Sequence, residues 1–274
     1  MVTVPGGPYD ITSGPDGALW FTLVEAGQVG RATPDGRVGV FDVGGGGPTV
    51  ITPGPDGALW FTRYRDHHIG RITTAGEVSA VAVPDTGPYG ITAGPDGALW
   101  FTETATHAVG RITPDGEASS FPLGSGFPSA IAAGADGALW CTLNADNALA
   151  RLTPDGEITR FPLPTEAAAP VGIAADAGGL WFTEIAAGQI GRATYDGEIT
   201  ETPLPDRAAR PHAVIATEDG CRFTEWAGSR VGALTDGGYR ATALPESAEP
   251  HGLTLGPDGA VWVALEAGAL ARIG

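Results

Sequence analysis

Apolar and polar positions recur along this chain with a period of about 40 residues, which is typical of a repeat architecture. Each period contains an apolar segment of the Leu-Trp-Phe-Thr type. The second positions of these segments are Trp20, Trp60, Trp100, Trp140, Trp181, Arg222 and Trp262. Arg222 is the one exception to Trp, and it keeps the spacing. The chain is therefore seven copies of one unit.

The unit around Trp100 contains four short runs rich in apolar, β-branched or aromatic side chains, at residues 88–91, 98–102, 109–113 and 117–123. Turns of the Gly-Pro-Asp-Gly and Pro-Asp-Gly type follow the first and third runs, and no stretch keeps a helical period. Four strands per unit describe one four-stranded antiparallel blade. The sequence therefore predicts an all-β fold, a seven-bladed β-propeller.

The ends of the chain predict how the ring closes. The last unit stops at residues 270–274, after its third strand. We expect residues 2–4 to supply the missing fourth strand, because a closed ring leaves no exposed sheet edge. Residues 1–274 are then one domain.

Composition excludes several classes of protein. Gly and Pro total 43 and 23 residues, but 42% of residues are hydrophobic and seven are Trp, so the chain can build a core rather than remain disordered. No apolar run approaches the roughly 18 residues of a membrane span. Residues 1–5 lack the basic and apolar regions of a signal peptide. We therefore expect a globular protein without membrane partners.

Charge and cysteine content limit the binding partners and the cellular compartment that we expect for this protein. The net charge is −17, and all 15 basic residues are Arg. No basic stripe is visible, so we expect no nucleic-acid partner. Strong negative charge makes copies repel one another, so we expect a monomer. The two cysteines, Cys141 and Cys221, occupy apolar positions, which favours a reduced, cytoplasmic protein.

Candidate functional residues are those that break the repeat. The residue after the Pro that opens each innermost strand is, in order, Tyr9, Thr49, Tyr89, Ser129, Val171, His212 and His251. These seven should surround one mouth of the central channel. Among the seven residues that lie two positions before these rim residues, only Arg210 and Glu249 are charged. Periodicity alone thus gathers two His, an Arg and a Glu in blades six and seven.

The loop between the second and third strands of each blade opens on the same rim. It carries Glu103, Glu184, Glu225 with Trp226, and Glu266. The loop of blade seven is one residue shorter than that of blade one, which re-aims Glu266. We expect Glu249, His251 and Glu266 to converge, as around a hard cation or an acid–base site.

Less specific interpretations stand beside this one. The same cluster is also consistent with a network that ties the closing blades together. Trp226 is either an exposed loop aromatic or a platform for an aromatic ligand. His67, His68 and His107 lie on the rim loops of blades two and three and are weaker candidates for a functional role. The recurrent Arg and turn Asp residues, such as Arg31 and Asp16, are expected to be structural pairs.

Several segments give the chain a specific resemblance. These are residues 7–9, 209–213, 223–226 and 248–252, together with the shortened loop that carries Glu266. Over essentially its whole length the chain resembles the virginiamycin B lyase, or streptogramin B lyase, family. The departures are Cys221 and Arg222 in blade six, a hairpin there two residues shorter, and Leu23 and Leu143 where other blades have Glu.

The resemblance implies a set of roles. His251 matches the family's catalytic His and His212 its second active-site His. Glu249 and Glu266 match the acidic pair associated with Mg²⁺, and Tyr9 matches the Tyr that contacts the substrate. Trp226 would pack, with Tyr9, on the substrate's aromatic rings.

The implied activity is linearisation of a cyclic depsipeptide antibiotic by elimination at the threonyl ester, which confers antibiotic resistance. Two other functions stay open. One is a metal-dependent propeller lactonase or hydrolase that resembles the gluconolactonase group, whose carboxylate- and Asn-rich site lacks the paired His. The other is a non-catalytic propeller that binds a ligand at its rim.

Overall fold

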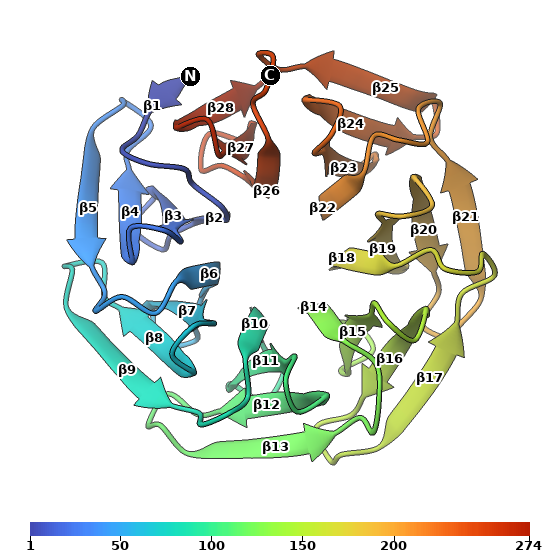
Figure 1. Ribbon diagram of the computed structural model, residues 1–274, viewed down its shortest axis with the longest axis horizontal. Coiled ribbons are helices and arrows are strands. Elements are labelled where there is room, and N and C mark those ends of the chain that lie inside the picture. The colour runs from blue at the N-terminus through green and yellow to red at the C-terminus, as the bar shows by residue number, and fades with distance from the viewer.

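Seven four-stranded antiparallel sheets surround a central channel in the computed structural model, which describes residues 1–274 (Figure 1). The innermost strands are β2 (Ile11–Ser13), β6 (Pro48–Pro53), β10 (Pro88–Ala93), β14 (Pro128–Ala133), β18 (Pro170–Asp176), β22 (Pro211–Thr217) and β26 (Pro250–Leu255). The second strands are β3 (Leu19–Leu23), β7 (Leu59–Arg63), β11 (Leu99–Glu103), β15 (Leu139–Leu143), β19 (Gly179–Glu184), β23 (Gly220–Glu225) and β27 (Val261–Leu265).

The outer half of each blade completes the sheet in chain order. The third strands are β4 (Gln28–Ala32), β8 (His68–Ile72), β12 (Ala108–Ile112), β16 (Ala148–Leu152), β20 (Gln189–Ala193), β24 (Arg230–Thr235) and β28 (Ala269–Ile273). The outermost strands are β5 (Val38–Asp42), β9 (Val78–Ala82), β13 (Ala118–Pro122), β17 (Ile158–Pro162), β21 (Ile199–Pro203), β25 (Gly238–Ala243) and, for blade seven, β1 (Val2–Thr3). The predicted seven-bladed propeller is confirmed.

The first strand closes the ring, as predicted. Val2 pairs with Leu270 and Thr3 with Ala269, so β1 is the outer edge of the sheet that contains β26, β27 and β28. Val4 lies beyond the strand but is buried, and its N–H donates to the carbonyl of Gly268 at 3.1 Å. Figure 1 shows the blue N-terminal strand beside the red C-terminal blade.

The core lies between the blades, where one sheet packs on the next. Trp20 of blade one packs with Ile51 and Phe61 of blade two, and its ring stacks on Phe41 at 5.6 Å. Because both faces of the second strand are covered, consecutive residues of β3 are all buried. The structure contains no helix with the length and apolar character that a membrane crossing needs.

The recurrent Asp and Arg residues are structural, as predicted. Asp16 accepts hydrogen bonds from Trp20 Nε1 at 3.0 Å and from Arg31 Nε at 2.7 Å, and the same triad recurs in other blades. In blade six, Arg222 occupies the Trp position and forms an ion pair with Asp219 at 2.9 Å. Cys141 and Cys221 are buried free thiols, and burial raises both pKa values to about 12.

Candidate active site

His212 and His251 lie side by side at one mouth of the channel. Each follows the Pro that opens an innermost strand, at an irregularity where the strand leaves regular register with its neighbour. The ring centroids are 4.9 Å apart and the rings are nearly perpendicular, at 86°. The predicted pairing of these two side chains is therefore what the fold produces.

Buried threonines hold the backbone of both histidines. Thr183 on β19 donates to the carbonyl of His212 at 2.7 Å, and Thr224 on β23 donates to the carbonyl of His251 at 2.8 Å. In each case the Thr belongs to the preceding blade. Hydrogen bonds between neighbouring blades thus fix the backbone position of each histidine.

Burial keeps both imidazoles neutral. It lowers the pKa of His212 to about 3, helped by the neighbouring His251, and it lowers the pKa of His251 to about 4. The Nδ1 atoms of both rings are buried and have no hydrogen-bond partner in the protein. At neutral pH each ring therefore carries one N–H donor and one acceptor nitrogen.

Two aromatic side chains, Tyr9 and Trp226, lie beside His251. The Tyr9 ring lies 4.5 Å from the imidazole centroid and the Trp226 ring 6.3 Å from it. The indole Nε1 of Trp226 is buried without a partner in the protein. His251 therefore sits between two aromatic surfaces suited to an apolar ligand.

The carboxylates lie on the open side of the same residue. Glu266 Oε1 is 3.4 Å from His251 Nε2. Glu249 and Glu266 both line a hollow of about 540 Å³ that also includes Tyr9 and Glu25. The backbone ties the two residues together, because Glu266 N–H donates to the Glu249 carbonyl at 3.2 Å.

The number and type of side-chain ligands indicate which metal ion Glu249 and Glu266 could bind. No group of three or more His, Cys, Asp or Glu side chains with metal-binding geometry is present. That excludes a preformed cage, but Mg²⁺ usually uses one or two carboxylates and keeps several waters. Glu249 and Glu266, exposed at the edge of one hollow, fit that mode.

Three carboxylates expected on the rim are not there. Glu103, Glu184 and Glu225 end the second strands and are buried. Glu225, for example, accepts hydrogen bonds from Arg230 at 2.7 Å and Tyr239 at 2.6 Å. Interior partners therefore hold these carboxylates away from the site.

Strand register explains why Glu266 behaves differently. Pro211 pairs with Glu225 in blade six, whereas Pro250 pairs with Leu265 in blade seven. Leu265 thus takes the buried position, and Glu266 takes the position that Trp226 has in blade six. That the shortened loop re-aims Glu266 stays a prediction.

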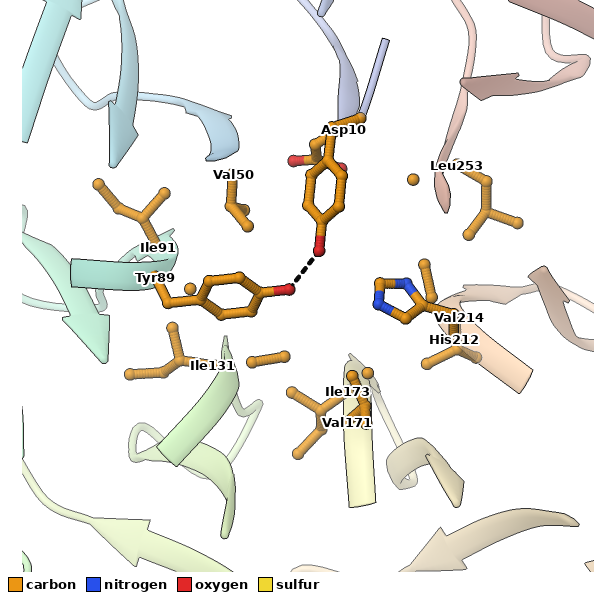
Figure 2. A pocket seen from close by; sticks show the side chains of 16 residues that line it. Asp10, Val50, Tyr89, Ile91, Ile131, Val171, Ile173, His212, Val214 and Leu253 are labelled. Carbon is orange, nitrogen blue, oxygen red and sulfur yellow. Dashed lines mark hydrogen bonds between the residues drawn. The ribbon is translucent and has the colours of Figure 1, made fainter. Parts of the chain in front are cut away.

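Sequence reasoning missed one residue in the channel, Asp10, and the contact between Tyr9 and Tyr89, which it placed on the same rim. The hydroxyls of Tyr9 and Tyr89 are hydrogen-bonded, and Figure 2 shows His212 facing Tyr89 across the channel. Asp10 lies in the wall of the same cavity of about 160 Å³. The series Asp10, Val50, Gly90, Ala130, Gly172, Ala213 and Gly252 would have found it, because Asp10 is its only charged member.

A second hollow extends the site away from the histidines. It has a volume of about 430 Å³ and shares Val24 and Thr49 with the hollow beside Glu266. Tyr64 and Phe127 line it and are 43% and 39% exposed, which is unusual for side chains of their size. An apolar shelf therefore adjoins the polar cluster.

The remaining histidines support loops. His67 Nδ1 accepts from the N–H of Gly87 at 3.0 Å, and the Nδ1 atoms of His68 and His107 lie 2.7 Å from the carbonyls of Asp66 and Gly126. Their hydrogen bonds to the backbone account for them without a ligand.

Comparisons with known proteins agree on one family. The family model described as the Virginiamycin B lyase family matches residues 1–273. A virginiamycin B lyase from Saccharopolyspora erythraea is 68% identical over 31 residues, a segment that is 11% of this chain and 10% of that relative. The matched segment thus spans only a tenth of the length of that curated relative.

Solved structures match over nearly the full chain. A streptogramin B lyase structure superposes with a TM-score of 0.93 at 39% identity and covers 98% of this chain and 94% of its own. A catalytically inactive His-to-Ala variant of virginiamycin B lyase from Staphylococcus aureus, crystallised with quinupristin, gives 0.92 at 38% identity, with 97% and 94% coverage.

Proposed function

The chain belongs to the virginiamycin B lyase family, and we propose that it linearises a cyclic depsipeptide lactone of the streptogramin B type by elimination. The observation that carries this proposal is the contact between a largely buried imidazole and an exposed carboxylate, with His251 Nε2 3.4 Å from Glu266 Oε1. The quinupristin complex of the Staphylococcus aureus relative supports a depsipeptide as the substrate.

The elimination moves one proton from the substrate to the enzyme and one electron pair onto the leaving carboxylate. In the substrate, the threonine oxygen is esterified to a C-terminal phenylglycine. The imidazole of His251 takes the proton from the threonine Cα, a double bond forms between Cα and Cβ, and the bond from Cβ to oxygen breaks. The electron pair of that bond leaves on the phenylglycine carboxylate, so the product is linear, contains a dehydrobutyrine and has the mass of the substrate.

A neutral base suits this step. Because burial lowers the pKa of His251 to about 4, the ring is unprotonated at neutral pH, as a general base must be before it takes a proton. His212, also neutral, would hydrogen-bond the substrate or the leaving carboxylate. Its Nδ1 has no competing partner in the protein.

We further propose that Glu249 and Glu266 hold Mg²⁺. When bound, the ion would polarise a substrate carbonyl and stabilise the enolate that forms as the proton leaves. Removing it with EDTA should abolish turnover, and adding Mg²⁺ back should restore it. Turnover that is unchanged in EDTA would contradict the assignment of both glutamates.

The shape of the rim suits a large apolar substrate. Tyr9 and Trp226 flank the base, and half-buried Val24, with the exposed side chains of Tyr64 and Phe127, continues away from it. A macrocycle with aromatic side chains would remove this apolar surface from water. A role in antibiotic resistance, a cytoplasmic location and a monomeric state stay predictions.

Weighing the product tests the reaction class directly. Incubation with a streptogramin B and Mg²⁺ should give a linear product of unchanged mass, measured by mass spectrometry after chromatographic separation. A gain of one water would mean hydrolysis, as expected of a propeller lactonase. Absence of any turnover would favour a rim that only binds a ligand.

Replacing the base tests its role. We expect His251→Ala to lower turnover by ~10²–10⁴-fold, the usual contribution of a general base. The matched control is His107→Ala, which removes a loop histidine on blade three. Near-full activity of His251→Ala would show that another group takes the proton.

A further inference from the structure

Arg210 stands out in the charge pairing of the molecule. Twelve of the 15 Arg side chains form an ion pair with a carboxylate. Arg207, Arg210 and Arg240 do not. In a chain with 32 Asp and Glu residues, a guanidinium without a carboxylate partner is exceptional. Arg210 is the one of the three that lies beside the proposed active site.

Its backbone mirrors that of Glu249. Arg210 comes two residues before His212, as Glu249 comes two before His251, and both have a left-handed φ, +52° and +48°. The Arg210 carbonyl accepts from Trp226 N–H at 3.2 Å, as the Glu249 carbonyl accepts from Glu266 N–H. The same rim position therefore presents a cation in blade six and an anion in blade seven.

The side chain of Arg210 is placed by an aromatic ring. Its guanidinium carbon lies 5.9 Å from the centroid of Trp226, and that ring lies 6.3 Å from the imidazole of His251. Stacking on an indole holds a guanidinium without using its five N–H donors. The buried Nε1 of Trp226 also lacks a partner in the protein. This side of the site thus offers hydrogen-bond donors from both Arg210 and Trp226.

We propose that Arg210, with Trp226, binds the carboxylate that elimination releases. This inference rests on the proposed function. The ester of the intact lactone has no net charge, whereas the leaving group gains the electron pair of the broken bond. Attraction to Arg210 therefore grows as the bond breaks, which is the differential binding that favours a reaction step.

The test compares an acid with its uncharged counterpart. The linear product and its C-terminal amide are titrated into the wild type, Arg210→Gln and Arg207→Gln, and binding is measured by calorimetry. We expect the wild type to prefer the acid by roughly tenfold, a value typical of a charge-assisted hydrogen bond at a partly exposed site. Arg210→Gln should lose that preference.

The controls separate local binding from general charge and from misfolding. Arg207→Gln removes the same charge three residues away in the same loop and should keep the preference. Arg210→Lys should keep part of it, because the charge remains but the planar fork is lost. The preference of the wild type should also weaken as salt rises.

Each outcome has a distinct meaning. If the wild type opens the lactone but binds acid and amide equally, or if Arg210→Gln keeps the preference, the inference about Arg210 is wrong and the proposed function stands. If the wild type leaves the lactone intact in the mass assay, the proposed function itself is overturned. If Arg207→Gln and Arg210→Gln lose the preference for the acid equally, long-range charge accounts for that preference, and the inference about a site at Arg210 is wrong.

Discussion

At the scale of single residues, burial and hydrogen bonding separate two kinds of histidine on one rim. His67, His68 and His107 use Nδ1 to bond the backbone of their own or adjoining loops. His212 and His251 are more buried, yet their Nδ1 atoms have no partner in the protein. A buried polar atom without a partner costs free energy, so a ligand that hydrogen-bonds these rings would relieve that cost.

Asp10 is the residue whose titration should be visible in stability. Its carboxylate accepts from Ile51 N–H at 2.9 Å, but burial raises its pKa from 3.8 to about 7. The folded state therefore binds a proton that the unfolded state has released, and the free energy of unfolding should fall as pH rises from about 4 to about 7. One pKa unit corresponds to about 1.4 kcal/mol, so the fall is a few kcal/mol at most.

We expect Asp10→Asn to remove this fall, because the amide keeps an acceptor for Ile51 N–H but does not ionise. Urea unfolding of both proteins at pH 5 and pH 7.5 measures it. The lowered pKa values of His212 and His251 act in the opposite direction over the acidic part of this range, so the difference between the two proteins isolates Asp10. An equal pH dependence in both would contradict the assigned shift.

At the scale of elements, a threonine hydroxyl in six of the seven seams positions the innermost strand of the next blade, and two of these strands carry the paired histidines. The Thr of each of the first six second strands donates to a carbonyl at the start of the next blade's innermost strand. These residues are Thr22, Thr62, Thr102, Thr142, Thr183 and Thr224. Each Thr oxygen also accepts from a backbone N–H of its own blade, as Thr224 does from Ala213 at 3.0 Å. Strand order and site geometry are thus linked through the seams.

Thr224→Val tests that link. It leaves the His251 carbonyl and the Ala213 N–H without a partner, which should cost ~1–3 kcal/mol of unfolding free energy. Turnover should fall roughly tenfold or more, since His251 loses its anchor. Thr102→Val is the matched control, because its hydroxyl holds the carbonyl of Ser129 in blade four, two blades away from His212. We expect equal destabilisation of both variants and full activity only in the control.

At the scale of the whole molecule, closure removes the two edges that a seven-bladed array would expose. The outer strand of blade seven contributes only two residues, Val2 and Thr3, so the seal is short. Buried Val4 extends it by packing in the core between blades seven and one. The ring therefore depends on a small number of contacts at its seam.

Deleting residues 1–4 should open this seam. We expect the melting temperature to drop by roughly 5–10 °C, as a loss of a few kcal/mol would cause, and β28 to be free to pair with a second copy. Calorimetry and size-exclusion chromatography measure the two effects. Deletion of exposed Met1 alone is the control. An unchanged melting temperature and elution volume would show that β1 is dispensable for closure.

The sequence by itself determined the repeat and everything that follows from counting along it. Regular spacing of the Trp segments predicted the blades, the unfinished last unit predicted closure, and the adjacent positions of His212 and His251 predicted their contact. These inferences succeed because a ring of identical units gives residues at the same repeat position the same place in space.

Only the tertiary structure decided what surrounds each of those positions. Glu103 and Glu225 occupy rim positions in sequence but are buried with partners, whereas Glu266 is exposed because Leu265 takes the inner register. Asp10 acquires its raised pKa from the channel wall, and Arg210 remains without a carboxylate partner. The burial of a side chain, the register of its strand and its hydrogen-bond or ion-pair partners depend on the neighbouring blades. They therefore arise from packing between blades and not from position along the chain.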